Sequence, residues 1–430
     1  MNEEKIVPKL RFSGFDDEWG EVKLGEIFDI KNGLNKGKEF FGKGIQILNY
    51  MDVNKHEFNT EKMIEGLVEL TEDEIERFSV KPNDLFFTRT SETSDEIGLT
   101  SAYIGNEVNC VFSGFILRAR PKIGLNSLFY AYYFRSPQQR NNIIKYSSIT
   151  TRALISGANL SKMKIRLPPA EEQNNIAKFL QIIDKKIELL EKKHQYYQDF
   201  KKYLMQQIFA QKLRFAEFDE EWKIVKLKNV GKINTGNTPS TKNKEYYTPE
   251  KYLWVTPSDI SSKYILNTER KLSEEGSKKG RFVKKNSVLV TCIASIGKNC
   301  IITEDGYFNQ QINSITPNKD YDYEFIYYLI CYNSERMKKY AGITATPILN
   351  KKSFENMKFE FPSLNEQKKI KNTLSNMDNK IFNLENMITK TQNFKKGLLQ
   401  QMFVYIFTIL HLNPIFRKIL MFNYYFSTLI

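Results

Sequence analysis

An eleven-residue phrase occurs twice in this 430-residue chain, and the repetition limits the folds that the chain can adopt. Residues 9–19 read KLRFSGFDDEW, and residues 212–222 read KLRFAEFDEEW. Self-similarity at a fixed distance indicates that one structural unit is used more than once. The repeat therefore predicts two similar domains in one chain.

Further segments recur in the same order after each copy of the phrase. The strand-like runs DLFFTRT (84–90) and SVLVTCI (287–293) each follow a basic turn. Later, SSITTRALISGANLSKMKI (147–165) matches AGITATPILNKKSFENMKF (341–359). Between these segments, each half contains another strand-like run and a tyrosine-rich stretch of helical period. Each half is therefore predicted to be a mixed α/β domain.

A long helical pattern follows each predicted domain, after a proline stop. Apolar residues alternate by four and three, which gives the 3.5-residue period of a coiled-coil seam. The seam positions are Ile176, Leu180, Ile183, Ile187 and Leu190 in the first pattern, and Ile370, Leu374, Met377, Ile381 and Leu384 in the second. Nothing else in the chain would bury such a stripe along its length. The two helices are therefore predicted to pair with each other.

Polar residues interrupt the seam in both helices. His194 lies on the first, and both copies keep a lysine, Lys201 and Lys395. One interpretation makes His194 a proton carrier, and the other makes it a register-setting or partly solvated polar position. We favour the second interpretation.

The predicted fold class is α+β, with two similar mixed α/β domains separated by two long helices that pair as an antiparallel coiled coil. The internal repeat gives this arrangement a pseudo-two-fold. The predicted boundaries are residues 1–165 for the first domain, 166–211 for the central helix, 212–359 for the second domain, 360–403 for the C-terminal helix and 404–430 for an apolar tail.

Composition restricts the chemistry available to the chain. The formal net charge is +14, which is typical of proteins that bind polyanions, although a lysine-rich solvated surface gives the same balance. The four cysteines form no CxxC pair, and the three histidines form no HExxH motif. The chain therefore lacks the clustered Cys and His residues that a metal site or a Ser-His-Asp triad needs. The lysine-rich GLNKGKE (33–39) falls short of a phosphate loop, and neither GxGxxG nor an NPPY-type methyltransferase tetrad occurs.

Taken in order, these segments resemble the specificity subunit of type I restriction–modification systems, over residues 8–403. The resemblance rests on the two KLRF phrases and on two further duplicated segments. These are LPPAEEQNNIAKFLQIIDKKI with FPSLNEQKKIKNTLSNMDNKI, and FKKYLMQQIF with FKKGLLQQMF. Single words of this kind are weak signals, but the whole set, in order and twice, is highly specific.

The resemblance implies a non-catalytic, cytoplasmic DNA-binding subunit. Each α/β domain is then a target recognition domain for one half of a split double-stranded DNA site, and the paired helices hold the halves at a fixed separation. The implied partners are two methyltransferase subunits and two restriction subunits that translocate and cleave DNA. S-adenosylmethionine, ATP and magnesium then belong to those partners, this chain binds no cofactor or metal, and no membrane is involved.

Candidate DNA-contacting residues follow from the chemistry of base and phosphate recognition, since Arg, Lys, Asn, Gln, Ser and Thr on loops suit these contacts. Segments in which the two halves diverge are the expected readers. The first domain offers Lys36, Arg89, Thr90, Ser91, Thr93, Gln138, Gln139, Arg140, Thr150, Thr151 and Arg152. The second offers Asn237, Thr238, Ser240, Asn309, Gln310, Gln311, Thr344 and Thr346. Lys36 is expected to face phosphate or solvent rather than a base.

Each of these residues has an ordinary alternative as a turn or cap residue. Tyr132 and Tyr133, at helical spacing, are predicted to be core residues rather than stacking platforms. For the whole chain, the competing interpretations are a coiled-coil adaptor, which leaves two diverged basic domains unexplained, and a self-contained restriction–modification enzyme, which needs a catalytic motif.

The repeated phrase itself is predicted to be a joint rather than a site. Its second copy begins just after the first long helix, so a pseudo-two-fold places the first copy near the end of the second helix, around Phe403. The apolar tail at 404–430 is interrupted by Asn413-Pro414 and Arg417-Lys418, which argues against a membrane span. We expect it to be poorly ordered or to pack on the coil.

Overall fold

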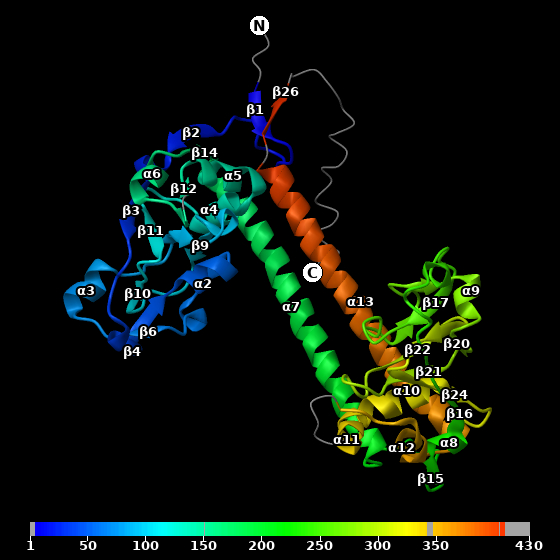
Figure 1. Cartoon of the computed structure of the whole chain (residues 1–430). Helices are drawn as coiled ribbons and strands as arrows, with labels where there is room; N and C mark the ends of the chain where they lie inside the picture. The colour runs from blue at the N-terminus through cyan, green and yellow to red at the C-terminus, as the bar shows by residue number, and fades with distance from the viewer. Residues whose placement is uncertain (1–4, 150, 342–346, 404, 409–430) are drawn as a thin grey trace. The chain divides into compact units, whose positions relative to one another are not determined.

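A computed structural model describes residues 5–149, 151–341, 347–403 and 405–408 of the chain (Figure 1). The chain divides into two compact units, residues 1–190 with 387–430 and residues 191–386. Two long helices, α7 (Ala170–Phe209) and α13 (Leu364–Met402), each contribute one half to each unit. Each unit therefore contains one α/β domain and two half-helices.

The first unit is built on a five-stranded sheet in the order β3-β11-β7-β9-β5. Its strands are β3 (Phe28–Asn32), β11 (Ile116–Pro121), β7 (Leu85–Thr88), β9 (Thr100–Tyr103) and β5 (Phe58–Asn59). All neighbours are antiparallel except β5 and β9, which are parallel. A second sheet joins β10 (Cys110–Phe112), β4 (Phe41–Leu48) and β6 (Leu67–Val68).

The second unit repeats this plan with different residues. Its five-stranded sheet has the order β16-β24-β21-β22-β18, again with one parallel pair at the end. These strands are β16 (Gly231–Thr235), β24 (Ile312–Pro317), β21 (Val288–Thr291), β22 (Asn299–Ile302) and β18 (Tyr264–Ile265). The smaller sheet joins β19 (Lys271–Leu272), β17 (Tyr252–Val255), β23 (Gly306–Phe308) and β20 (Arg281–Val283). The matching strand orders confirm the predicted internal repeat.

Short elements complete both domains. Two-stranded ladders join β2 (Gly20–Lys23) to β14 (Lys164–Leu167) and β15 (Lys223–Lys226) to β25 (Lys358–Phe361). The remaining helices of the first domain are α1 (Leu24–Ile27), α2 (Tyr50–Lys55), α3 (Glu72–Arg77), α4 (Ser127–Arg135), α5 (Pro137–Lys145) and α6 (Gly157–Ser161). Those of the second are α8 (Leu227–Val230), α9 (Glu274–Ser277), α10 (Tyr323–Tyr332), α11 (Ser334–Tyr340) and α12 (Lys351–Asn356).

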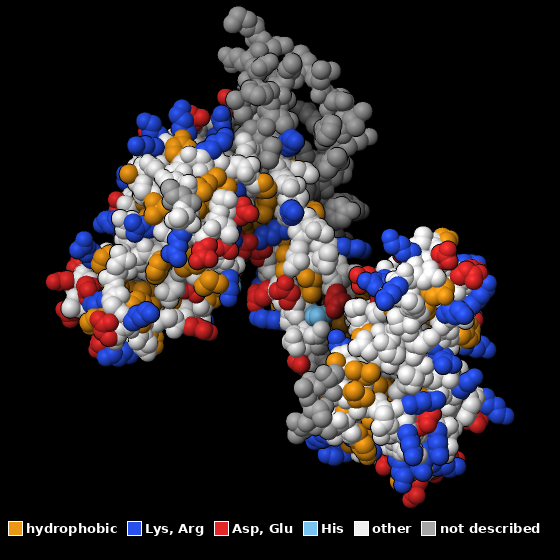
Figure 2. Space-filling view, viewed as in Figure 1, with side chains coloured by type: hydrophobic (Ala, Val, Ile, Leu, Met, Phe, Trp, Pro, Cys, Tyr) orange, Lys and Arg blue, Asp and Glu red, His pale blue; other side chains and the backbone are white. Residues whose placement is uncertain are grey.

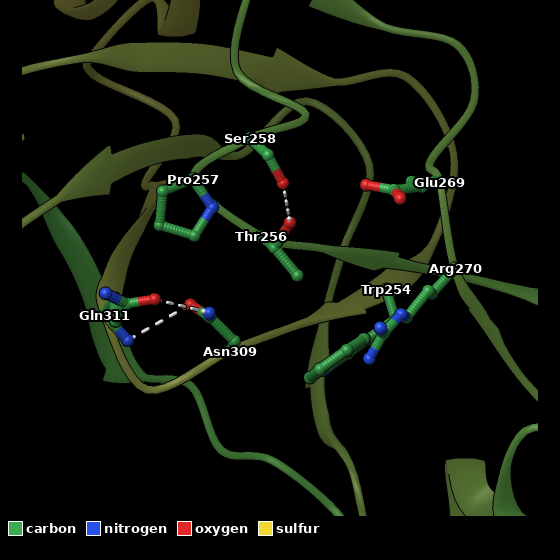
Figure 3. A pocket seen from close by; sticks show the side chains of 8 residues that line it. All are labelled: Trp254, Thr256, Pro257, Ser258, Glu269, Arg270, Asn309 and Gln311. Carbon is green, nitrogen blue, oxygen red and sulfur yellow. Dashed lines mark hydrogen bonds between the residues drawn. The ribbon is translucent and has the colours of Figure 1, made fainter. Parts of the chain in front are cut away.

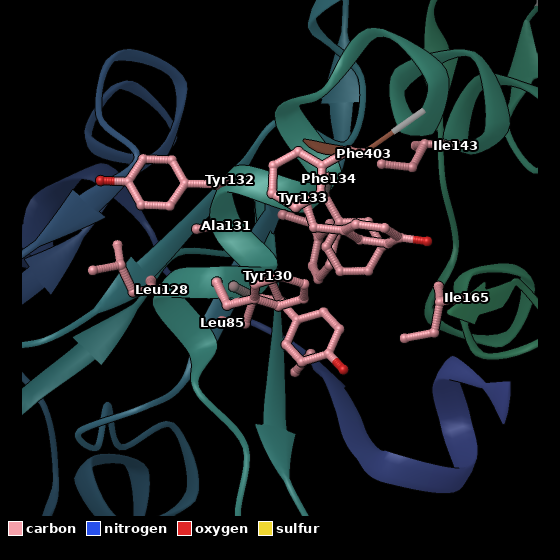
Figure 4. Packing of buried hydrophobic residues seen from close by; sticks show 14 of the residues in the cluster. Leu85, Leu128, Tyr130, Ala131, Tyr132, Tyr133, Phe134, Ile143, Ile165 and Phe403 are labelled. Atoms are coloured by element: carbon pink, nitrogen blue, oxygen red, sulfur yellow. The ribbon is translucent and has the colours of Figure 1, made fainter. Parts of the chain in front are cut away.

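The tyrosine-rich helix α4 lies in the core of the first unit (Figure 4). Asn126 caps it by accepting a hydrogen bond from the Phe129 amide, so the helix starts at Ser127. Tyr132 and Tyr133 are 0% and 1% exposed, which confirms that both are core residues. Phe403, just past α13, packs edge-on against the rings of Phe129 and Tyr133. The end of α13 is thereby fixed to the first domain.

Within each unit the two long helices run antiparallel. In the first unit, the start of α7 shares a hydrophobic cluster with Leu398 and Met402 near the end of α13. In the second unit, Leu204 and Ile208 near the end of α7 share a cluster with the start of α13. Of the predicted seam positions, Ile176, Leu180, Ile183, Leu190, Ile370, Leu374 and Leu384 are buried, and Ile187, Met377 and Ile381 are partly buried.

The polar seam residues pair across the helices in one consistent register. Asp184 pairs with Lys395, His194 with Glu385, and Lys201 with Asp378. The residue numbers of the α7 partners rise by ten and then by seven, and those of the α13 partners fall by ten and then by seven, as antiparallel pairing requires. His194 Nε2 lies 3.0 Å from Glu385 Oε1, so the polar seam residues have the partners that a register-setting role needs.

The repeated phrase binds the first turn of a long helix in both units. Arg11 contacts both carboxylate oxygens of Glu172, at 2.6 and 2.7 Å, and the Trp19 indole donates to the same carboxylate at 2.9 Å. In the second unit, Arg214 and Trp222 hold Glu366 in the same way. The two glutamates are buried, with side chains 0% and 1% exposed. We call each set of three residues an Arg–Glu–Trp clamp.

The position of the first phrase agrees with the pseudo-two-fold. The Leu10 amide donates to the Gln401 carbonyl at 3.0 Å, which places the phrase at the end of α13. The predicted location near Phe403 is therefore confirmed. The phrase is a joint at which a domain meets the start of one long helix and the end of the other.

The tail after α13 begins differently from the expectation. Strand β26 (Tyr405–Thr408) pairs antiparallel with β1 (Lys5–Pro8), from Lys5 opposite Thr408 to Pro8 opposite Tyr405 (Figure 1). The first residues of the tail thus extend a strand instead of packing on the coil, because β1 offers an unpaired edge beside them. Residues 409–430 lie outside the described part of the chain. Among the described residues, no helix combines the length and apolar character needed to cross a membrane.

Candidate nucleic-acid interface

In the first unit the structure brings the predicted loops together. Strand β8 (Thr90–Ser91), after β7, pairs with β13 (Ala153–Leu154), which in turn pairs with β12 (Ser148–Ile149). This three-stranded ribbon joins two segments that lie about 60 residues apart in the sequence, a separation that only tertiary pairing closes. Thr93, Thr151 and Arg152 are exposed beside it, and Arg152 lies 3.7 Å from Glu92. Thr93, Thr151 and Arg152 therefore share one surface, and Thr90 is partly buried beside them. Ser91 is 6% exposed and donates to Glu96, so it supports the loop from within the fold.

The third predicted group, Gln138 to Arg140, lies on α5, which packs under the loop after β8. Arg140 donates to the backbone carbonyls of Asp95 and Ile97, and Gln139 is 4% exposed. Burial lowers the pKa of Arg140 to about 10. Arg140 thus holds the loop after β8 and Gln139 is buried, whereas Gln138 is exposed. Within the group, Gln138 is the residue free to meet a ligand.

Arg89 and Lys36 have partners within the fold. The Arg89 amide donates to the Phe115 carbonyl at 2.9 Å, and its Nη1 lies 3.3 Å from the Gly114 carbonyl. Lys36 donates to Glu74 at 2.5 Å and lies over the Phe40 ring. Lys36 is thus engaged in an ion pair rather than presented as an isolated cation. Thr150, predicted with Thr151 and Arg152 as a candidate DNA contact, lies outside the described residues.

In the second unit two predicted segments meet. The Asn237 amide donates to the Phe308 carbonyl at 3.0 Å, and the Thr238 hydroxyl donates to the Gln310 side chain. Asn309 Nδ2 donates to Gln311 Oε1 at 3.1 Å. Thr238, Ser240 and Gln310 are exposed, so this junction presents hydroxyl and amide groups to solvent. Thr344 and Thr346 lie outside the described residues.

A hollow of about 430 Å³ opens beside this junction (Figure 3). Its lining includes Asn309 and Gln311, which the sequence indicated, and six residues that it did not: Trp254, Thr256, Pro257, Ser258, Glu269 and Arg270. Trp254 lies in β17, and the other missed residues follow β17 or precede β19 and look like ordinary turn residues in the sequence. A strand pairing between β17 and β23 brings them to Asn309, and no local pattern carries that information.

A partly buried polar network ties each domain to the long helices. In the first unit, the Tyr132 hydroxyl donates to Asp184 at 2.6 Å, and Lys395 lies 2.6 Å from the same carboxylate. In the second unit, Tyr328 donates to Asp378, which also pairs with Lys201. We call each Tyr–Asp–Lys set a joint network. Each links a domain helix, one long helix and the other long helix, so it fixes the domain relative to both.

One charge differs between the two joint networks. In the first unit Glu57, just before β5, accepts from Lys395 at 2.9 Å. In the second, the matching position before β18 is Lys263, which donates to Glu324, Tyr328 and Ser375. The two positions correspond because the carbonyls of Glu57 and Lys263 accept from Ala102 and Ile301, on equivalent strands. The frame is shared, and the local charge is reversed.

Glu324, which pairs with Lys263 beside the joint network of the second unit, is predicted to make the stability of that unit depend on pH. Its carboxylate is 10% exposed, and although burial acts to raise its pKa, the hydrogen bond and charge of Lys263 lower it to about 2. A depressed folded-state pKa contributes stability that is present above the unfolded-state pKa of 4.5 and is lost as pH falls towards 2. We expect the Glu324→Gln variant to lose less stability than wild type between those pH values, by roughly 3 kcal/mol at most. Denaturant unfolding at pH 7, 4.5 and 3 measures the difference, and parallel curves for the two proteins would contradict it.

Comparison with known proteins agrees with this architecture. The family model for the type I restriction modification DNA specificity domain matches the chain twice, at residues 16–196 and 219–392. A specificity subunit assigned to the type I restriction enzyme MjaX of Methanocaldococcus jannaschii is 25% identical over 399 residues, covering 88% of this chain and 91% of the relative. The HindI specificity subunit of Haemophilus influenzae is 32% identical over 149 residues, 33% of this chain and 32% of the relative.

Solved structures show the same fold. The S subunit of a type I restriction–modification system from M. genitalium has a TM-score of 0.55 at 15% identity, covering 93% of this chain and 99% of that one. The HsdS subunit from Thermoanaerobacter tengcongensis has a TM-score of 0.51 at 14% identity, covering 92% and 97%. The duplicated domains and paired helices define a two-domain specificity protein. The chain belongs to the type I restriction–modification DNA specificity family.

Proposed function

We propose that the two domains read the two halves of a split, asymmetric DNA target. The observation that carries this proposal is that the two domains share one strand order but present different loops. Both domains have the same strand order, yet the first presents the ribbon of β8, β13 and β12 and the second presents the hollow beside Asn309. Unlike surfaces on one frame read unlike half-sites. Figure 2 shows Lys and Arg side chains over much of the visible surface of the second unit, which suits contact with phosphates.

A split target is physically useful because each domain reads only a few base pairs. One mismatched base pair costs about 1–3 kcal/mol, so a single short half-site gives weak discrimination. Two domains fixed on a common support add their discrimination and also measure the distance between half-sites. In support of this proposal, a joint network and an Arg–Glu–Trp clamp bind each domain to the halves of the long helices in its own unit.

The chain is proposed to act as a non-catalytic subunit in the cytoplasm and to scaffold two methyltransferase and two restriction subunits. S-adenosylmethionine, ATP and magnesium are assigned to these partners. Purified chain is expected to bind no S-adenosylmethionine and to methylate DNA only after a cognate methyltransferase is added. Methyl transfer by the chain alone, measured with labelled S-adenosylmethionine, would favour the self-contained enzyme instead.

An exposed apolar stripe on α7 supports docking of the methyltransferase. Ile182, Leu189, Tyr196 and Tyr203 recur every seven residues and are 43–63% exposed. They lie outside the buried seam, and in a helix that pairs with one other helix these positions are usually polar. Exposed aromatic residues are common anchors of protein interfaces. The stripe is therefore a proposed contact surface for a partner helix.

Truncating this stripe is expected to weaken methyltransferase binding. The double variant Tyr196→Ala, Tyr203→Ala removes two exposed rings, and we expect about a tenfold or greater loss of affinity, as for interface anchors. Calorimetry with the purified methyltransferase measures the change. Gln198→Ala is the matched control, because this exposed residue lies two positions from Tyr196 and therefore on another face of α7. Equal affinities for the double variant and this control would remove the stripe from the interface.

A further inference from the structure

We propose that the hollow of the second unit holds the edges of base pairs, and that Gln311 and Arg270 determine specificity in the half-site read by that unit. The inference rests on the proposed function and names residues that carry it. Gln311 and Asn309 lie on one side of the hollow and Glu269 and Arg270 on the other (Figure 3). Convergent polar groups around a concave surface are the usual form of a specific binding site.

Strand pairing builds the hollow. β17 and β23 run parallel, with Trp254 opposite Tyr307 and Val255 opposite Phe308. Parallel strands end at the same edge of a sheet, so the loops that follow them emerge side by side. One loop carries Thr256 and Ser258, and the other carries Asn309 and Gln311. The site therefore stands on regular structure rather than on one isolated loop.

Hydrogen bonds hold the walls of the hollow in place before any ligand arrives. Asp259 accepts from the Thr256 amide at 2.7 Å and from the Glu269 amide at 2.8 Å, which joins two walls. On the opposite wall, Asn309 Oδ1 accepts from the Gln311 amide at 3.1 Å. Walls that are already fixed lose little conformational freedom on binding, which favours selective contacts.

The same hydrogen bonds set the chemistry that the hollow offers. Gln311 Oε1 accepts from Asn309 Nδ2, which leaves the Gln311 amide NH₂ as a donor directed away from that contact. Arg270 is exposed at the rim, and the neighbouring Glu269 is exposed as well. A carboxylate beside the guanidinium disfavours phosphate and favours bases, whose edges carry both donors and acceptors. Arginine pairs with guanine O6 and N7, and glutamine pairs with adenine.

The first unit supplies an internal comparison. β4 and β10 also run parallel, and Asp52 accepts from the Asn49 amide at 2.7 Å, just as Asp259 does from Thr256. The Phe115 carbonyl accepts from Arg89 as the Gln311 carbonyl accepts from Cys292. Phe115 therefore occupies the place of Gln311, and it is 63% exposed. The frame is kept and the presented group changes from an amide to an apolar ring, as expected for residues that read different sequences.

The test uses the complex of full-length chain and cognate methyltransferase on DNA libraries randomised at each half-site. Gln311→Ala and Arg270→Ala are each expected to reduce discrimination about tenfold or more at one or two base pairs of one half-site, the selectivity of one bidentate contact. The other half-site stays unchanged. Gln311→Glu, which replaces an amide donor by an acceptor, is expected to shift the preferred base. Phe115→Ala is expected to alter only the opposite half-site.

Controls separate the possible outcomes. Lys352→Ala, an exposed change on α12 of the same unit, is expected to leave every base preference unchanged. Thermal unfolding of each variant verifies that the fold is intact. A uniform loss of methylation with base preferences unchanged would make the hollow a phosphate contact and overturn the inference, and so would unchanged preferences at full activity. A wild-type complex that selects no two-part motif would instead refute the proposed function.

Discussion

The Glu172→Ala variant is expected to lower the free energy of unfolding of the first unit by about 3–5 kcal/mol, the usual cost of removing one partner from a buried ion pair. Glu172 is fully buried and accepts hydrogen bonds from Arg11 and from the Trp19 indole. Its loss leaves a cation, 10% exposed, and a buried indole N–H without this acceptor. The Arg–Glu–Trp clamp also joins the first segment of the chain to α7, so several packed elements are released together.

Glu171→Ala is the matched control, because the neighbouring side chain has the same chemistry and is exposed. We expect this control to change stability by less than about 0.5 kcal/mol, as surface substitutions usually do. Urea unfolding followed by tryptophan fluorescence measures both, since Trp19 belongs to the clamp. If the two variants unfold at the same urea concentration, the clamp is not a stabilising joint.

Replacing residues 20–165 with the equivalent domain of a relative is expected to change one half of the recognised target completely and to leave the other half intact. The first domain has its own five-stranded sheet and core, so its reading loops depend on residues inside the exchanged segment. Arg11 and Glu172 lie outside the segment and Trp19 immediately precedes it, so the Arg–Glu–Trp clamp is retained. Of the residues in and around the joint network, Tyr132 and Glu57 lie within the segment, and the donor domain must supply their equivalents.

Selection of methylated sites from a random DNA library reads out this exchange. The chimera and the wild-type chain are assayed with the same methyltransferase, and the exchange of residues 223–359 serves as the reciprocal control. The expected result is that each chimera changes one half of the motif, and that the two chimeras change different halves. A chimera that alters both halves, or neither, would contradict independent reading by the two domains.

The joints illustrate how far the sequence could be read. The KLRF phrase predicted a junction, and its location near Phe403 is confirmed by the Leu10–Gln401 hydrogen bond. The partner of the phrase was not predictable, because Glu171 and Glu172 are adjacent and chemically identical. Only the rotation of α7 decides which of them is buried. Similarly, the heptad pattern predicted the seam, but the pairing of Lys395 with Asp184 depends on a register that the pattern leaves open.

The sequence predicted which loops belong to the candidate interface, but it did not predict how these loops are arranged in space. Divergence between the two halves indicated the segments around Thr90 and Asn309, and these lie where several loops meet. The contributions of Trp254 and Arg270 to the hollow depend on long-range strand pairing, which leaves no local periodicity in the sequence. The same reason explains β26, since its partner strand lies at the opposite end of the chain.

The measurement that tests the central claim most directly is a map of methylated adenines in DNA treated with the full-length chain and its cognate methyltransferase. A reader with two unlike domains on a fixed support predicts one two-part motif, with two different half-sites separated by a constant number of unspecified base pairs. It also predicts no methylation when either protein is omitted. A continuous motif, two identical half-sites, a variable spacing, or methylation by this chain alone would contradict the account.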